Sequence, residues 1–113
     1  MKDMDRFIAM IATEVHKAEN KYPIFCNRLP RIGNTLELTQ FALATARARS
    51  DAEKHGGYSF ENTINEEILE VLEAWQLEDY DACMTELAQC GAVILRAMDF
   101  VNKYKGDKHG NNG

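Results

Sequence analysis

Features that define several common protein classes are scarce in this chain of 113 residues. Two prolines and seven glycines give too few turn signals for a β-sandwich or a β-barrel. No apolar run reaches about 18 residues, so no transmembrane helix and no membrane partner are expected. Neither a Walker A motif nor a G-x-G-x-x-G loop is present, which excludes the two common glycine-rich phosphate sites.

Basic residues are also fewer than acidic ones. Thirteen Lys and Arg residues against eighteen Asp and Glu give a net charge of −5, which disfavours polymeric nucleic acid as a partner. The N-terminus, MKDMDRFIAM, has acids where a secretory signal has its basic region. We therefore expect no signal peptide and a cytoplasmic location.

The three cysteines are an odd number without framework spacing, which is typical of reduced thiols. No cysteine has a histidine beside it in sequence, so a cysteine nucleophile is disfavoured. A zinc site is disfavoured because C-x-x-C and H-x-x-x-H spacings are absent. The residues considered for zinc are His16, Cys26, His55, Cys83 and Cys90.

Apolar residues recurring every three or four positions predict four helices, over about 3–20, 34–54, 63–77 and 80–104. Asn34 or Thr35 is expected to cap the second helix. A capping box from Thr63 to Glu66 is expected to open the third, and Asp79 or Asp81 to cap the fourth. The prediction is an all-α fold with a four-helix core, as one domain over 1–104 and a flexible polar tail over 105–113.

Two apolar segments lead to further expectations. In the break at 21–33, five side chains are expected to pack onto the body of the protein: Tyr22, Ile24, Phe25, Leu29 and Ile32. Segment 87–101 is apolar on nearly every side, so a partner subunit is expected to cover part of it. A close helix crossing would explain Gly91, which costs about 1 kcal/mol in mid-helix. A homodimer or homotetramer follows from this.

The most informative stretch is acidic. Glu67, Glu70 and Glu73 are three residues apart, which places their carboxylates in a row along one side of a helix. No Lys or Arg occurs between residues 55 and 95 to neutralise them. A divalent cation with hard oxygen ligands would do so, whereas the alternative is a solvated acidic face.

The following helix contributes a second polar pair, Glu86 and Gln89. A short link between antiparallel helices would bring this pair opposite Glu67 and Glu70. Facing helices that each contribute a Glu pair form metal sites inside helical bundles. Asp99 lies ten residues beyond Gln89, about 15 Å along the helix, so it does not replace Gln89.

The pattern Glu67-x-x-Glu70, then Glu86-x-x-Gln89, resembles the motif of the MazG-like all-α nucleoside triphosphate pyrophosphohydrolases. The resemblance covers residues 62–101. It implies Mg²⁺- or Mn²⁺-dependent cleavage of the α–β phosphoanhydride of nucleoside triphosphates, which yields monophosphate and pyrophosphate. It also implies Glu67 and Glu70 as catalytic residues, and Glu67, Glu70, Glu86 and Gln89 as metal ligands.

Gln89 departs from the family motif, which has Asp at this position. An amide oxygen can still bind a hard cation but brings no charge. This departure keeps open a second function, a non-catalytic helical oligomerisation or regulatory protein with a decayed metal site.

Other residues are candidates for substrate contact. Trp75 can stack on a base or belong to the core, and Lys103 and Lys105 can bind phosphate or favour the helix dipole. A further basic set can reach a triphosphate or form a solvated helix face: Arg47, Arg49 and Lys54.

Overall fold

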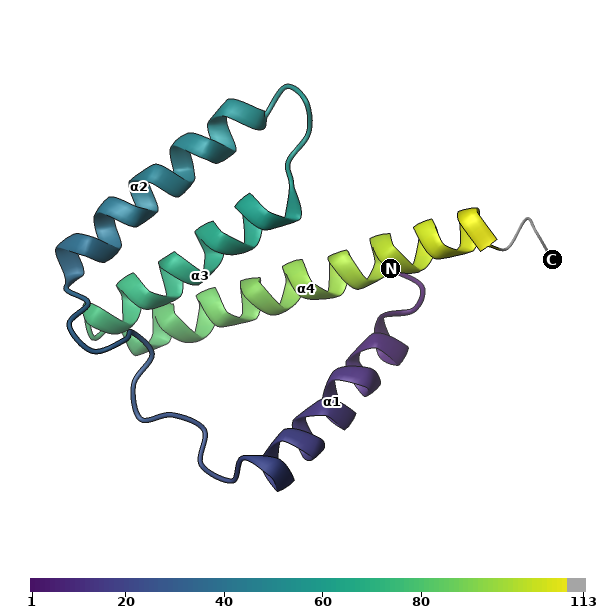
Figure 1. The fold of residues 1–113 in the computed structure, drawn as a ribbon, viewed down its shortest axis with the longest axis horizontal. Coiled ribbons are helices and arrows are strands. Elements are labelled where there is room, and N and C mark those ends of the chain that lie inside the picture. The colour runs from purple at the N-terminus through teal and green to yellow at the C-terminus, as the bar shows by residue number, and fades with distance from the viewer. Residues whose placement is uncertain (110–113) are drawn as a thin grey trace. The chain divides into compact units, whose positions relative to one another are not determined.

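The computed structural model describes the backbone of residues 1–109 and the side chains of residues 1–107. Over this range the chain forms four helices and no strand, which confirms the all-α prediction (Figure 1). They are α1 (Met4–Lys21), α2 (Leu36–Glu53), α3 (Phe60–Gln76) and α4 (Tyr80–His109). None of the helices in the described range is long and apolar enough to cross a membrane.

The chain divides into two compact units. One unit is Arg28–Val93, and the other combines Met1–Asn27 with Ile94–Gly113. Helix α4 belongs to both units, since it begins at Tyr80 and continues past Ile94. The single domain predicted over 1–104 stays a prediction.

In the Arg28–Val93 unit, α2 and α3 lie side by side and antiparallel (Figure 1). The buried stripe of α2 is Thr39, Leu43, Ala46 and Ser50, at spacings of three and four residues. The more apolar positions Leu38 and Phe41 remain exposed. Apart from Leu43, the packed face of α2 therefore consists of small or polar residues.

Helix α3 packs against the beginning of α4 through a small apolar core. Val71 and Ala74 of α3 are buried with Cys83 of α4. The Cys83 thiol, whose pKa is raised by burial, donates to the Val71 carbonyl at 3.6 Å. These contacts fix the rotation of α4 relative to α3 one turn before Glu86.

The turn between α3 and α4 is three residues long, Leu77 to Asp79. Glu78 has a left-handed φ of 58°, and the Asp79 amide donates to the Ala74 carbonyl at 3.0 Å. This is the hydrogen-bond pattern of a Schellman motif, with Glu78 where glycine is usual. Asp79 then caps α4 by accepting from the Ala82 amide at 3.1 Å, as one of the two predicted caps.

The predictions for the starts of α2 and α3 differ in accuracy. Thr35 caps α2, accepting from the Leu38 amide at 3.2 Å, which agrees with one of the two expected caps. The predicted start of α3 at Thr63 is wrong, because Ser59 is the cap and Thr63 lies inside the helix. The Thr63 hydroxyl donates to the Ser59 carbonyl at 2.8 Å instead of capping.

Two expectations for the ends and connections also need correction. Helix α4 was expected to end near Tyr104 but continues to His109, so residues 105–109 of the predicted tail are helical. The rest of that tail, 110–113, lies outside the described residues. In the 21–33 break only Leu29 packs on the core, because the rest of its large apolar side chains are exposed. The exposed ones are Tyr22, Ile24, Phe25 and Ile32.

Much apolar surface of α4 is uncovered in the single chain. Met84, Leu87, Ile94, Phe100 and Val101 are all exposed. A Cβ added at Gly91 would meet no described atom within 4 Å, so the described residues show no close crossing at this position.

Candidate metal centre

Three carboxylates converge where α3 faces the first half of α4. Glu67 and Glu70 extend from α3 and Glu86 from α4, and one oxygen of each lies within 4.8 Å of the others. The i, i+3 spacing puts Glu67 and Glu70 on one side of α3, and the short turn brings Glu86 opposite them. We call Glu67, Glu70 and Glu86 the acidic cluster.

The surroundings of the acidic cluster disfavour negative charge. Partial burial raises the pKa of Glu70, and the Glu86 carboxyl raises it further by hydrogen bonding to the protonated form and by repulsion. Burial also raises the pKa of Glu67, with added repulsion from Glu70 and Glu66. The Cys90 thiol, next along α4, has its pKa raised by burial and then by the three acids. A bound cation would lower the free-energy cost of ionising each of these groups.

Gln89 places its amide beside two members of the acidic cluster. Its nitrogen is assigned toward the carboxylates, because the opposite orientation would set the amide oxygen against acceptors only. In this orientation the nitrogen donates to Glu67 Oε2 at 3.1 Å and to Glu86 Oε2 at 2.9 Å. The amide thus joins the two helices without a cation, and its oxygen, which faces away from these carboxylates, must turn toward them before it can bind a cation.

A basic residue from α2 reaches the same acids. Arg47 Nη2 lies 3.5 Å from Glu70 Oε1, and Arg47 Nε lies 3.8 Å from Glu66 Oε1. Ser50, one turn further along α2, donates to Glu66 Oε2 at 3.2 Å. The sequence predicts triphosphate contact or a solvated helix face for Arg47 and not this pairing with the acids, because the rotation of α2 depends on its packing with α3.

The donor set fits a hard divalent cation. Carboxylate and amide oxygens are the ligands that Mg²⁺, Mn²⁺ and Ca²⁺ prefer. One oxygen from each of the three carboxylates lies within 4.8 Å of the others, so all three residues could contribute ligand atoms to one cation.

The other predicted site residues lie in different surroundings. Glu73 continues the row on α3 but is not part of the acidic cluster. Trp75 packs on the Val71–Ala74–Cys83 core and makes an edge-to-face contact with Tyr80, with 5.4 Å between ring centroids. Lys103 and Lys105 belong to the other compact unit, where Lys103 pairs with Asp99 at 3.0 Å.

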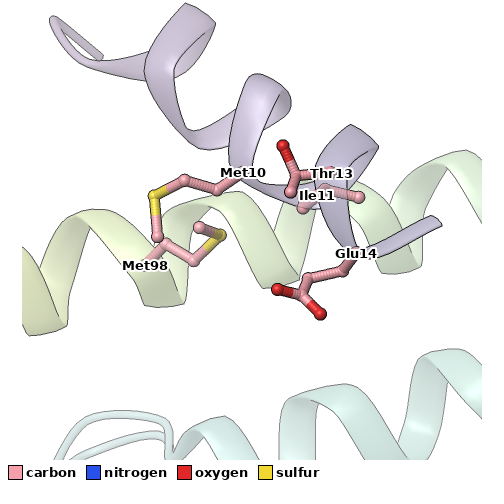
Figure 2. A pocket seen from close by; sticks show the side chains of 5 residues that line it. All are labelled: Met10, Ile11, Thr13, Glu14 and Met98. Carbon is pink, nitrogen blue, oxygen red and sulfur yellow. The ribbon is translucent and has the colours of Figure 1, made fainter. Parts of the chain in front are cut away.

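That other unit contains an open pocket of about 340 Å³ (Figure 2). Figure 2 shows Met10 and Met98 reaching into it from α1 and α4. Its one charged lining residue, Glu14, pairs with Lys17 at 3.3 Å. No pattern in the sequence predicts this pocket, since its lining residues come from two segments far apart in the chain.

Comparison with protein-family models, with curated proteins and with solved structures finds no match to this chain.

Proposed function

We propose that this protein is a Mg²⁺-dependent nucleoside triphosphate pyrophosphohydrolase, with Mn²⁺ as a possible substitute. The observation that carries the proposal is the convergence of Glu67, Glu70 and Glu86 from two facing helices within 4.8 Å. The raised pKa values of Glu67 and Glu70 add support, because these two residues bear a charge cost that a bound cation offsets.

In this proposal, water adds across the α–β phosphoanhydride and gives a nucleoside monophosphate and pyrophosphate. Glu67, Glu70 and Glu86 would hold the cation, and Gln89 would join them as a neutral fourth ligand once its amide turns its oxygen toward them. The cation would supply charge neutralisation at the phosphate oxygens. A carboxylate oxygen of Glu67 or Glu70 orients the attacking water and accepts its proton.

The test is pyrophosphate release from a panel of canonical and modified ribo- and deoxyribonucleoside triphosphates with Mg²⁺ or Mn²⁺. We expect activity in the wild type, its loss in Glu67→Gln, and its retention in Glu73→Gln. Glu73 is a matched control because it lies on the same helix but outside the acidic cluster. Activity that survives Glu67→Gln undiminished would place the chemistry elsewhere.

One observation favours the second candidate, a non-catalytic oligomerisation or regulatory protein. The Gln89 amide already bridges Glu67 and Glu86, so part of the acidic cluster is satisfied without a cation. A wild type that is silent toward every nucleotide, with or without Mn²⁺, would support this candidate.

We also propose that a second copy of the chain covers the exposed apolar residues of α4, as a homodimer or homotetramer. Soluble monomers seldom leave large apolar patches uncovered, and Phe100 and Val101 are 70% and 61% exposed. Light scattering should show a dimer or larger, and a clean monomer at micromolar concentration would contradict this.

A further inference from the structure

Arg47 is the basic side chain that the described structure pairs with the carboxylates around the candidate site. One of its partners, Glu70, belongs to the acidic cluster, whereas the other, Glu66, does not. Because α3 and the facing part of α4 carry no Lys or Arg, positive charge must reach these acids from another helix. Helix α2 supplies it through Arg47.

The two ion pairs are loose. Charge-assisted N–H···O bonds are usually about 2.7–2.9 Å long. The Arg47 nitrogens lie 3.5 Å from Glu70 and 3.8 Å from Glu66. The Arg47 side chain is also 53% exposed. Exposed pairs of this kind contribute between about 0 and 1 kcal/mol, so the guanidinium can exchange partners at little cost.

Glu66 gives Arg47 a fixed neighbour that is independent of the acidic cluster. The Ser50 hydroxyl, on a residue buried in α2, orients Glu66 through the 3.2 Å hydrogen bond. Arg47 therefore stays beside the site even when Glu70 is engaged by another cation. Arg47 therefore lies at the edge of the site, where its guanidinium is available to bind an anion.

Charge balance gives Arg47 a role. When all are ionised, Glu66, Glu67, Glu70 and Glu86 together with Arg47 carry a net charge of three negative units. One divalent cation leaves one negative unit, which still repels a phosphate chain. A guanidinium that exchanges a carboxylate for phosphate oxygens removes part of this barrier, and its planar fork matches phosphate geometry.

We propose that Arg47 is the phosphate-recognition residue of this site, held by Glu66 and Glu70 in the absence of ligand and transferred to the polyphosphate of a cation-bound ligand. This inference rests on the proposed function. It assigns two opposing effects to one side chain: Arg47 repels the cation alone and attracts the cation–polyphosphate complex.

The test measures two affinities by calorimetry, at pH 8 and constant ionic strength. One probe is Mn²⁺ alone and the other is the magnesium–pyrophosphate complex. In Arg47→Gln we expect Mn²⁺ to bind about fivefold more tightly, because a like charge beside the site is removed. The same variant should bind magnesium–pyrophosphate at least about tenfold more weakly, because charge-assisted hydrogen bonds are lost.

Opposite signs are the signature of this role, since a disturbed fold would weaken both affinities. Arg47→Lys keeps the charge but loses the fork, so it should bind Mn²⁺ like the wild type and pyrophosphate with intermediate affinity. Arg49 is exposed and lies about 200° around α2 from Arg47, on a different side from the acids, so Arg49→Gln should leave both affinities unchanged.

Arg47→Gln that matches Arg49→Gln in both measurements, or that weakens Mn²⁺ binding, would overturn the proposal for Arg47. A wild type that binds no Mn²⁺ would remove the proposed function and this inference together. A wild type that shows the two opposite effects but hydrolyses no nucleotide would retain the role of Arg47 and remove only the catalytic function.

Discussion

Glu53 at the end of α2 and Glu70 in the middle of α3 are both half-buried carboxylates, yet their pKa values move in opposite directions. The pKa of Glu53 is lowered, first by the Ser59 backbone amide at 2.7 Å and also by the Ser59 hydroxyl and the Asn62 amide. The pKa of Glu70 is raised by burial and by neighbouring acids.

The difference separates a structural carboxylate from a candidate ligand. Glu53 receives three hydrogen bonds and joins the end of α2 to the start of α3, so its charge is satisfied by the fold. Glu70 has one loose pair with Arg47 and faces Glu86 across the helix interface. A carboxylate whose own fold does not satisfy its charge is available to an added cation.

The largest expected effect is therefore a cation-dependent gain in stability that needs Glu70 and not Glu53. At a hundredfold excess over its Kd, Mn²⁺ should stabilise the wild type by about 2.7 kcal/mol. Glu70→Gln should abolish this gain, whereas Glu53→Gln should keep it. Thermal melts with and without millimolar Mn²⁺ measure this gain in stability. Equal gains in both variants would contradict the distinction between Glu53 as a structural carboxylate and Glu70 as a candidate ligand.

Substituting Gln89, the neighbour of the acidic cluster, should have the next largest effect, which is on the affinity for Mn²⁺. Gln89→Asp adds a negative charge beside Glu67 and Glu86, so Mn²⁺ should bind about tenfold more tightly. The metal-free protein should become less stable, because the bridging amide is lost. Gln89→Asn is the control of equal length without charge, and tighter Mn²⁺ binding by both variants would exclude the charge as the cause.

Without any cation, neutralising the two carboxylates should shift the melting temperature in opposite directions. Glu53→Gln should lower Tm, since an amide nitrogen replaces one carboxylate oxygen and cannot accept, so the hydrogen bonds from Ser59 to Oε1 and from Asn62 to Oε2 cannot all be kept. Glu70→Gln should raise the stability by a few tenths of a kcal/mol, a gain limited by solvent screening. Melts in chelator test this, and a fall of Tm in both variants would contradict the comparison.

The smallest effect expected is a pH dependence of opposite sign. A raised folded-state pKa means that Glu67 and Glu70 bind protons more tightly when folded, so their contribution to stability increases as pH falls from 7 toward 4.5. The lowered pKa of Glu53 means that its contribution is present above pH 4.5 and is lost below it. Urea unfolding of the chelated protein should give a higher free energy of unfolding at pH 5 than at pH 7. This difference should be smaller in the double variant Glu67→Gln/Glu70→Gln.

The sequence predicted the acidic cluster better than its surroundings, for physical reasons. The side of α3 that carries Glu67 and Glu70 follows from helix geometry alone, and a short acidic link leaves few ways to place Glu86. The Arg47 contacts depend on how α2 rotates onto α3. That rotation is set by a buried stripe in which, apart from Leu43, the residues are small or polar and do not stand out as a buried face: Thr39, Ala46 and Ser50.

The error at the start of α3 has a similar origin. Thr63 and Glu66 match a capping box in spacing, but Ser59 and Asn62 already use the carboxylate of Glu53 from the preceding helix. A partner six residues upstream of Ser59 is not part of any local capping pattern. The exposed apolar residues at 21–33 likewise show that hydrophobicity alone does not identify a contact within one chain.

The tight turn at Glu78 also limits how the length of this chain can vary. One residue inserted in α4 between Cys83 and Glu86 would rotate the following residues by about 100° and carry Glu86 and Gln89 away from α3. Seven inserted residues would nearly restore the rotation but shift both side chains along the axis by about 10 Å. The α2–α3 loop at 54–59 precedes both acidic pairs, so insertions there preserve the spacing between Glu70 and Glu86. Chains descended from the same ancestor should therefore vary in length before α3 and keep the spacing from Glu67 to Gln89 constant.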